Sequence, residues 1–154
     1  MTVYGFDSSA LVKRYVTESG TAWVRSLVVP AAGHTIFVAQ ITSVEVVSAL
    51  ARRAREGQIA PRTGRAARLL VDRHHVREYQ VIRLTDAIVQ GAEDLLERHP
   101  LRAADALQLA SASAIHSRLI ANSLPGLVIV SADQRLLTAA MAEGLQTDNP
   151  DLHP

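Results

Sequence analysis

Four consecutive apolar residues, Leu127-Val128-Ile129-Val130, decide the fold of this sequence. An uninterrupted aliphatic run of this kind is typical of a strand that is buried on both faces of a parallel sheet. Pro125-Gly126 stands before the run and Ser131-Ala132-Asp133 follows it, which predicts a turn on one side and a helix cap on the other. Parallel strands are joined by crossover connections that are usually helical, so helices are expected elsewhere in the chain.

The rest of the chain alternates between strand-like and helix-like segments. Strand character is found at Val3–Phe6, at 34–38, at 81–84 and, as a brief edge strand, at 145–147. Helical spacing, with Thr42 or Ser43 and Thr85 as caps, predicts helices at 11–16, Thr21–Val28, 43–57, 61–79, 85–99, 102–122 and 134–143. This order predicts an α/β domain with a mainly parallel sheet of four to five strands and helices on both faces.

The composition is that of one globular domain over residues 1–154. Hydrophobic residues make up 48% of the chain and charged residues 20%, which is too apolar for a disordered segment. The absence of cysteine excludes a disulfide framework, a thiolate zinc site and a cysteine nucleophile. The start lacks a signal-peptide pattern, and Pro30, Gly33 and Gln40 interrupt the longest uncharged stretch, so we expect a cytoplasmic protein without a membrane span.

Four acidic residues fall at positions that the predicted topology brings together. Asp7 ends the first strand, and Asp133 lies just beyond the strand at Leu127-Val128-Ile129-Val130. Glu45 lies in the first turn of the helix after the second strand, and Asp105 lies in the first turn of the long helix. Ligands of such sheets bind beyond the carboxyl ends of the strands, so four carboxylates are expected at one edge.

Each of these acids alone is explained by helix capping or by the helix macrodipole, as Asp86 after Thr85 illustrates. Together they require more, because like charges at short range need a cation or protons to be tolerated. A site built only from carboxylates selects hard ions such as Mg²⁺ or Mn²⁺ over zinc. Such an ion activates water and neutralises the developing charge on a phosphodiester, so the pattern predicts metal-dependent phosphate chemistry.

Four stretches that contain these acids also carry a resemblance to a known family. The segments YGFDSSALVK at 4–13, TSVE at 42–45, LRAADALQLA at 101–110 and VSADQRL at 130–136 resemble, in family order, the four acidic motifs of PIN-domain ribonucleases. The compact size and the long third motif are similar to those of VapC-type toxins of type II toxin–antitoxin systems. The resemblance covers almost the whole chain, and it implies a single PIN-like nuclease domain at 1–154.

The resemblance implies a three-layer α/β/α fold and a Mg²⁺- or Mn²⁺-dependent endoribonuclease that acts on RNA. It also implies a homodimer that a cognate VapB-type antitoxin holds inactive. By motif position, Asp7 and Asp105 would be the main metal ligands, and Asp133 a further ligand, directly or through water. Glu45 would position or deprotonate the attacking water. Cleavage would leave a 3′ hydroxyl and a 5′ phosphate.

Two serines and one glutamine accompany the acids. Ser8 and Ser131 stand beside acidic residues, where each can orient a carboxylate, contact a substrate phosphate or cap a helix. Gln108 occupies a position at which many members of the family have histidine, which leaves the role of that side chain open.

Basic residues are concentrated in one part of the chain. The stretch from Arg52 to Arg83 contains nine arginines and three acids, a formal charge of +6, whereas the remainder carries −5. Arginine binds phosphate through a planar fork of donors, so Arg52 and Arg53 are candidate contacts to an RNA backbone. A solvated helical hairpin or an antitoxin contact explains the same pattern. The aromatic content of 4% argues against recognition by base stacking.

Other function classes remain as alternatives. A phosphoacceptor regulatory domain also places acids at strand ends, but it needs a basic residue late in the chain, and the only lysine here is Lys13. A stand-alone PIN nuclease, or a catalytically idle binding module with the same fold, stays open. The sequence leaves open the target RNA, the number of metal ions and the identity of the antitoxin.

Overall fold

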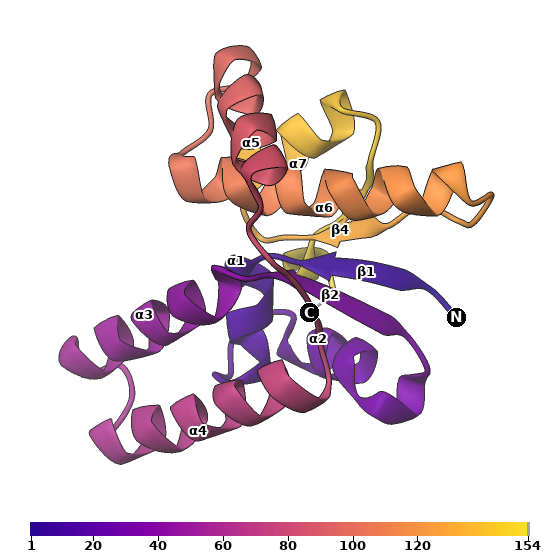
Figure 1. Cartoon of the computed structure of the whole chain (residues 1–154). Coiled ribbons are helices and arrows are strands. Elements are labelled where there is room, and N and C mark those ends of the chain that lie inside the picture. The colour runs from indigo at the N-terminus through magenta and orange to yellow at the C-terminus, as the bar shows by residue number, and fades with distance from the viewer. Residues whose placement is uncertain (154) are drawn as a thin grey trace.

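The first strand, β1 (Val3–Phe6), forms the centre of a five-stranded sheet in a computed structural model that describes residues 1–153 (Figure 1). The other strands are β2 (Thr35–Ala39), β3 (Gln80–Ile82), β4 (Val128–Val130) and β5 (Gln146–Asp148), in the spatial order β3-β2-β1-β4-β5. Every pairing of these strands within residues 1–153 is parallel. The predicted sheet is therefore confirmed and is parallel throughout.

Seven α-helices connect the strands of the described part of the chain. They are α1 (Ser8–Leu11), α2 (Thr21–Val28), α3 (Thr42–Arg55), α4 (Pro61–Arg77), α5 (Asp86–Arg98), α6 (Ala103–Ala121) and α7 (Gln134–Ala142). Short 3₁₀ turns lie at Val12–Arg14, Pro30–Ala32 and Pro150–Leu152. None of the helices within residues 1–153 has the length and apolar character that a membrane span requires.

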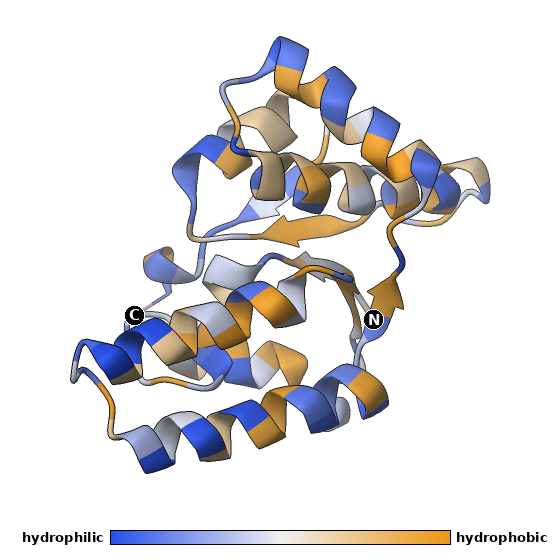
Figure 2. Cartoon of the chain, turned by 60° about the vertical axis from the view of Figure 1, so that its left-hand side comes forward, coloured by the Kyte–Doolittle hydropathy of each residue, from blue (hydrophilic) through white to orange (hydrophobic). Residues whose placement is uncertain are grey.

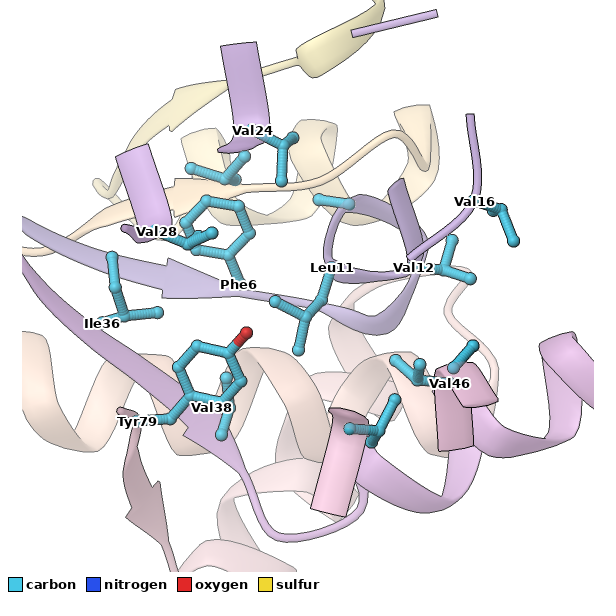
Figure 3. Packing of buried hydrophobic residues seen from close by; sticks show 14 of the residues in the cluster. Phe6, Leu11, Val12, Val16, Val24, Val28, Ile36, Val38, Val46 and Tyr79 are labelled. Carbon is cyan, nitrogen blue, oxygen red and sulfur yellow. The ribbon is translucent and has the colours of Figure 1, made fainter. Parts of the chain in front are cut away.

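The helices form one layer on each face of the sheet, which gives the predicted three-layer α/β/α arrangement (Figure 1). Alternate residues of β2 divide between two cores, because Ile36 and Val38 pack with the layer of α1 to α4 and Phe37 packs with the layer of α5 to α7. Figure 3 shows Phe6 and Val38 of the sheet among the valines of α2 and α3. Figure 2 shows that the sheet is largely hydrophobic, whereas hydrophobic and hydrophilic residues alternate along the helices.

Three local predictions differ from the structure. The helix expected at 11–16 is instead the single turn α1 followed by the 3₁₀ turn at Val12–Arg14. Gly20 adopts a left-handed conformation (φ 77°), and α2 begins directly after it. The third strand ends at Ile82 instead of at 84, since the backbone N–H of Leu84 donates to the side chain of Gln40 (2.9 Å) and not to a strand. The third difference concerns the caps.

Thr85 caps α5 as predicted, and its hydroxyl accepts a hydrogen bond from the Ile88 N–H (3.3 Å). At α3 the cap prediction was wrong. Ile41 occupies the N-cap without a side-chain hydrogen bond, and the hydroxyl of Thr42 donates to Gln108 Oε1 (3.0 Å). The site at the sheet edge therefore uses a hydroxyl that sequence reasoning had assigned to the helix end.

The topology brings three chain segments to one edge of the sheet. β1 lies between β2 and β4, so the residues after all three strands emerge side by side. The backbone N–H of Asp7 donates to the Val130 carbonyl (3.2 Å), which extends the β1–β4 ladder by one bond. The start of α6 reaches the same edge from the opposite helical layer (Figure 1).

Candidate active site

A cleft of about 620 Å³ opens at the carboxyl edge of the sheet, and all four predicted acids line it: Asp7, Glu45, Asp105 and Asp133. They come from the end of β1, the first turn of α3, the first turn of α6 and the residue before α7. The structure thus brings together the four side chains that the sequence placed at one edge. We refer to this space as the acidic cleft.

Asp7 is the most buried of the four acids, with 5% of its surface exposed. Its Oδ1 atom accepts a hydrogen bond from the Ala10 N–H (2.9 Å), and its Oδ2 atom accepts one from the Ser131 hydroxyl (2.8 Å). Burial raises the pKa of Asp7 to about 6, in spite of these bonds, and the charge of Glu45 adds to the rise. The fold therefore holds a carboxylate whose charge is only partly compensated by the protein.

Two serines hold Asp7 in place. Ser131 is fully buried and also accepts a hydrogen bond from the Asp133 N–H (2.9 Å), so it joins the two acidic segments. Ser9 donates to the Asp7 carboxylate (2.8 Å) and accepts from the Ala132 N–H (2.9 Å). Sequence reasoning missed Ser9. The sequence did contain a signal for it, because a hydroxyl two residues after an acid at a strand end can hydrogen bond back to that acid. Because Ser131 is fully buried, water does not readily replace its hydrogen bond to Asp7.

Glu45 is held by Gln108, whose side-chain amide donates to its Oε2 atom (2.6 Å), and the Ser8 side chain lies beside the same carboxylate at the cleft. Burial raises the pKa of Glu45 above its ordinary value, and repulsion from Asp105 acts in the same direction, whereas Gln108 and Ser8 oppose the rise. The sequence predicted only a cap role for Thr42 and left the role of Gln108 open, because their contact joins helices from opposite layers.

Asp105 and Asp133 complete the acidic cleft. Burial raises the pKa of Asp105, and the charge of Asp133 raises it further. Asp133 is also the N-cap of α7, because its Oδ1 atom accepts hydrogen bonds from the N–H groups of Arg135 (2.8 Å) and Leu136 (3.3 Å). Capping and membership of the site are compatible, since a carboxylate has further lone pairs available.

The donor set of the acidic cleft fits a hard divalent cation. All four side chains offer oxygen, and repulsion acts between Asp7 and Glu45, between Glu45 and Asp105, and between Asp105 and Asp133. Within residues 1–153, no three acidic or histidine side chains are close enough together to enclose an ion by themselves. A hard cation held here would therefore take one or two of the carboxylates directly and keep waters at its remaining positions.

Basic side chains surround the acidic cleft unevenly. Arg52, Arg53 and Arg102 line it, and Arg53 also forms an ion pair with Glu18 (3.0 Å). Sequence reasoning missed Arg102, which directly precedes α6. Three other arginines of the basic segment, Arg55, Arg65 and Arg68, line a separate groove of about 600 Å³ between α3 and α4.

Comparison with known proteins agrees with this geometry. The family model described as "PIN domain" matches residues 4–140, which include all four acids of the cleft. The chain is 31% identical over 159 residues to Ribonuclease VapC45 of Mycobacterium tuberculosis, a match that covers 100% of both chains.

Solved structures share the fold. VapC20 of M. tuberculosis, described as a sarcin–ricin loop cleaving toxin, superposes with a TM-score of 0.61 at 15% identity and covers 90% of this chain and 95% of that one. VapBC2 from Rickettsia felis, solved with a DNA fragment from its promoter, gives a TM-score of 0.59 at 12% identity over 96% of this chain and 98% of that one.

Proposed function

The chain belongs to the PIN-domain family, and we propose that it is an endoribonuclease that serves as the toxin of a VapBC-type toxin–antitoxin pair. The observation that carries the proposal is the convergence of Asp7, Glu45, Asp105 and Asp133 on one cleft. Full-length identity to a ribonuclease VapC supports RNA as the substrate. The proposed catalytic unit is a single domain over residues 1–154.

The proposed cofactor is Mg²⁺ or Mn²⁺. Asp7 and Asp105 would be its main ligands, and Asp133 would hold it directly or through water. When bound, the ion would supply a water of lowered pKa and would neutralise charge on the scissile phosphate. The rise in the pKa of Asp7 to about 6 supports this proposal, because a buried carboxylate with surplus charge is stabilised by a cation.

Glu45 is proposed to orient the attacking water and to accept its proton. Its raised pKa favours this role, since a general base is most effective when its pKa approaches the working pH. Arg52, Arg53 and Arg102 would hold the RNA backbone at the rim, and Ser8 would stand between Glu45 and the substrate. In-line attack on the phosphate would leave a 3′ hydroxyl and a 5′ phosphate.

The proposed partners follow from the relatives. VapBC2 from R. felis is solved with DNA from its promoter, and for this chain we propose a cognate VapB-type antitoxin and a homodimeric toxin. An antitoxin that inhibits cleavage has to cover the acidic cleft or block the approach of RNA to it.

The direct test is incubation of the purified protein with structured RNAs and Mg²⁺ or Mn²⁺. The variants Asp7→Ala and Asp105→Ala should lose cleavage while their circular dichroism spectra stay native. Asp86→Ala is the matched control, because Asp86 is also an acid in the first turn of a helix but does not line the acidic cleft. Metal-dependent cleavage that survives both substitutions would remove the proposed site. Tight antitoxin binding without any cleavage by the wild type would favour an idle binding module.

A further inference from the structure

A chain of two hydrogen bonds links the N-terminal parts of α3 and α6. The Thr42 hydroxyl donates to Gln108 Oε1 (3.0 Å), and Gln108 Nε2 donates to Glu45 Oε2 (2.6 Å). Thr42 is fully buried and Gln108 is 6% exposed, so water does not readily replace either bond. We call these three residues the Thr42–Gln108–Glu45 relay.

The chemistry of the three groups fixes the direction of the relay. An ionised carboxylate only accepts hydrogen bonds, so the amide of Gln108 has to turn its NH₂ group toward Glu45. The amide oxygen then faces Thr42, whose hydroxyl supplies the donor. With the amide reversed, its oxygen would face the Glu45 carboxylate, and two acceptors would repel each other. The Glu45 carboxylate therefore selects the amide orientation, and the Thr42 hydroxyl supplies the donor that the amide oxygen then needs.

Helical spacing gives the relay its place in the site. Thr42 and Glu45 are three residues apart on α3, and Asp105 and Gln108 are three residues apart on α6, so each pair shares one face of its helix. One face of α6 thus carries both an acid of the cleft and the amide that holds Glu45. The relay sets the position of Glu45 relative to Asp105 across two helical layers.

We propose that Gln108, held by Thr42, is the positioning residue that aims the Glu45 carboxylate at the attacking water. The proposal rests on the proposed nuclease function. Gln108 does not line the acidic cleft, so it acts through Glu45 and not on the substrate. Supporting contacts of this kind typically change activity by about 10- to 100-fold when removed.

The first experiment measures kcat and KM for RNA cleavage by single variants. Gln108→Leu removes both hydrogen bonds at similar volume, and it should lower kcat by about 10- to 100-fold with KM changed by less than about twofold. Thr42→Val should lower kcat by a smaller factor, and Thr42→Ser, which keeps the hydroxyl, should restore it. Gln90→Leu is the matched control, because Gln90 is an exposed helical glutamine whose amide donates to Asp94 on the same helix.

A double-mutant cycle separates positioning from a general structural role. Adding Gln108→Leu to Glu45→Gln should cause no further loss of kcat, because the relay then has no carboxylate to aim. An equal loss in both backgrounds would overturn the proposal, as would Thr42→Ser behaving like Thr42→Val. If Gln108→Leu does not fold, the comparison of Thr42→Val with Thr42→Ser in the same cycle decides. A wild type that does not cleave RNA removes the proposed function, whereas a cleaving wild type with fully active Gln108→Leu removes only the relay.

Discussion

The acidic cleft and the arginine-rich hairpin of α3 and α4 carry the two opposite charges of this molecule, and they are built in different ways. In the cleft, Asp7 is buried and held by hydrogen bonds to backbone and serines. In the hairpin, the arginines of α4 are exposed, and the ion pair of Arg68 with Asp72 leaves both side chains 52% exposed. Exposed pairs of this kind contribute little to stability.

The fold fixes the position of the buried charge on Asp7, whereas the arginines of α4 are charges on an exposed surface. A strand end fixes where Asp7 lies, and its burial raises its pKa, so its position is costly to the fold unless a ligand uses it. The exposed arginines of α4 have no such desolvation penalty, and contact with RNA, with antitoxin or with solvent is compatible with their positions. Only Arg52 and Arg53 of the basic segment line the acidic cleft, so the two regions meet along α3 and not along α4.

The largest expected effect is loss of activity in Asp7→Asn. This change keeps the shape of the side chain but removes the charge that would hold the cation, so kcat/KM for RNA should fall by about 10³-fold or more. Single-turnover cleavage at saturating Mg²⁺ measures this loss. Full activity of the variant would show that the buried carboxylate of the acidic cleft has no part in the reaction.

The same substitution should stabilise the protein. The folded-state pKa of Asp7 lies above the ordinary value, at about 6 against 3.8, so the ionised group opposes folding above pH 6. This penalty falls as the pH drops from 6 and disappears below 4. Without divalent cations at pH 7.5, Asp7→Asn should therefore raise the free energy of unfolding by up to about 3 kcal/mol, and the gain should vanish near pH 4. Urea denaturation at both pH values tests this, and a gain that does not depend on pH would contradict it.

Divalent cations should offset most of that difference in stability. A ligand present at about 100 times its Kd stabilises the native state by roughly 2.7 kcal/mol. Addition of Mg²⁺ or Mn²⁺ should therefore raise the Tm of the wild type by several degrees and that of Asp7→Asn by much less. Differential scanning calorimetry of both proteins gives the comparison, with Asp86→Asn as a control that should respond like the wild type. Equal shifts in all three would place the cation elsewhere.

The smallest expected effect concerns the arginines that distinguish the acidic cleft from the α3–α4 hairpin. Arg52→Gln at the cleft should weaken RNA binding by about three- to tenfold and lower the slope of log K against log salt by about one. Arg65→Gln on α4 should leave both unchanged, because Arg65 lines the groove between the helices and not the cleft. Fluorescence anisotropy over a range of salt concentrations measures both quantities. An equal loss for the two variants would extend the RNA surface over the hairpin.

The parts of the site that follow strands were predictable from the sequence. The apolar runs at Val3–Phe6 and Leu127-Val128-Ile129-Val130 mark the strand ends that position Asp7 and Asp133, and helix starts after Ile41 and Arg102 position Glu45 and Asp105. Local patterns determine these placements because a parallel sheet aligns the carboxyl ends of its strands.

The supporting contacts could not be predicted in the same way. Thr42 has the chemistry of a helix cap, and only the packing of α3 near α6 turns its hydroxyl toward Gln108. The role of Ser9 likewise depends on a hydrogen bond with a segment more than 120 residues away in the sequence. The division of the arginines between cleft and groove depends on where α3 passes the sheet edge, which no local pattern encodes.

The most direct test of the central claim measures RNA cleavage as a function of Mg²⁺ concentration for the wild type, Asp105→Asn and Asp86→Asn. If the acidic cleft holds the catalytic cation, cleavage depends on the cation in the wild type and in Asp86→Asn, is abolished by a chelator, and is lost in Asp105→Asn at every Mg²⁺ concentration. Cleavage by Asp105→Asn at the wild-type rate, or cleavage that persists in the chelator, would contradict a catalytic cation at this cleft.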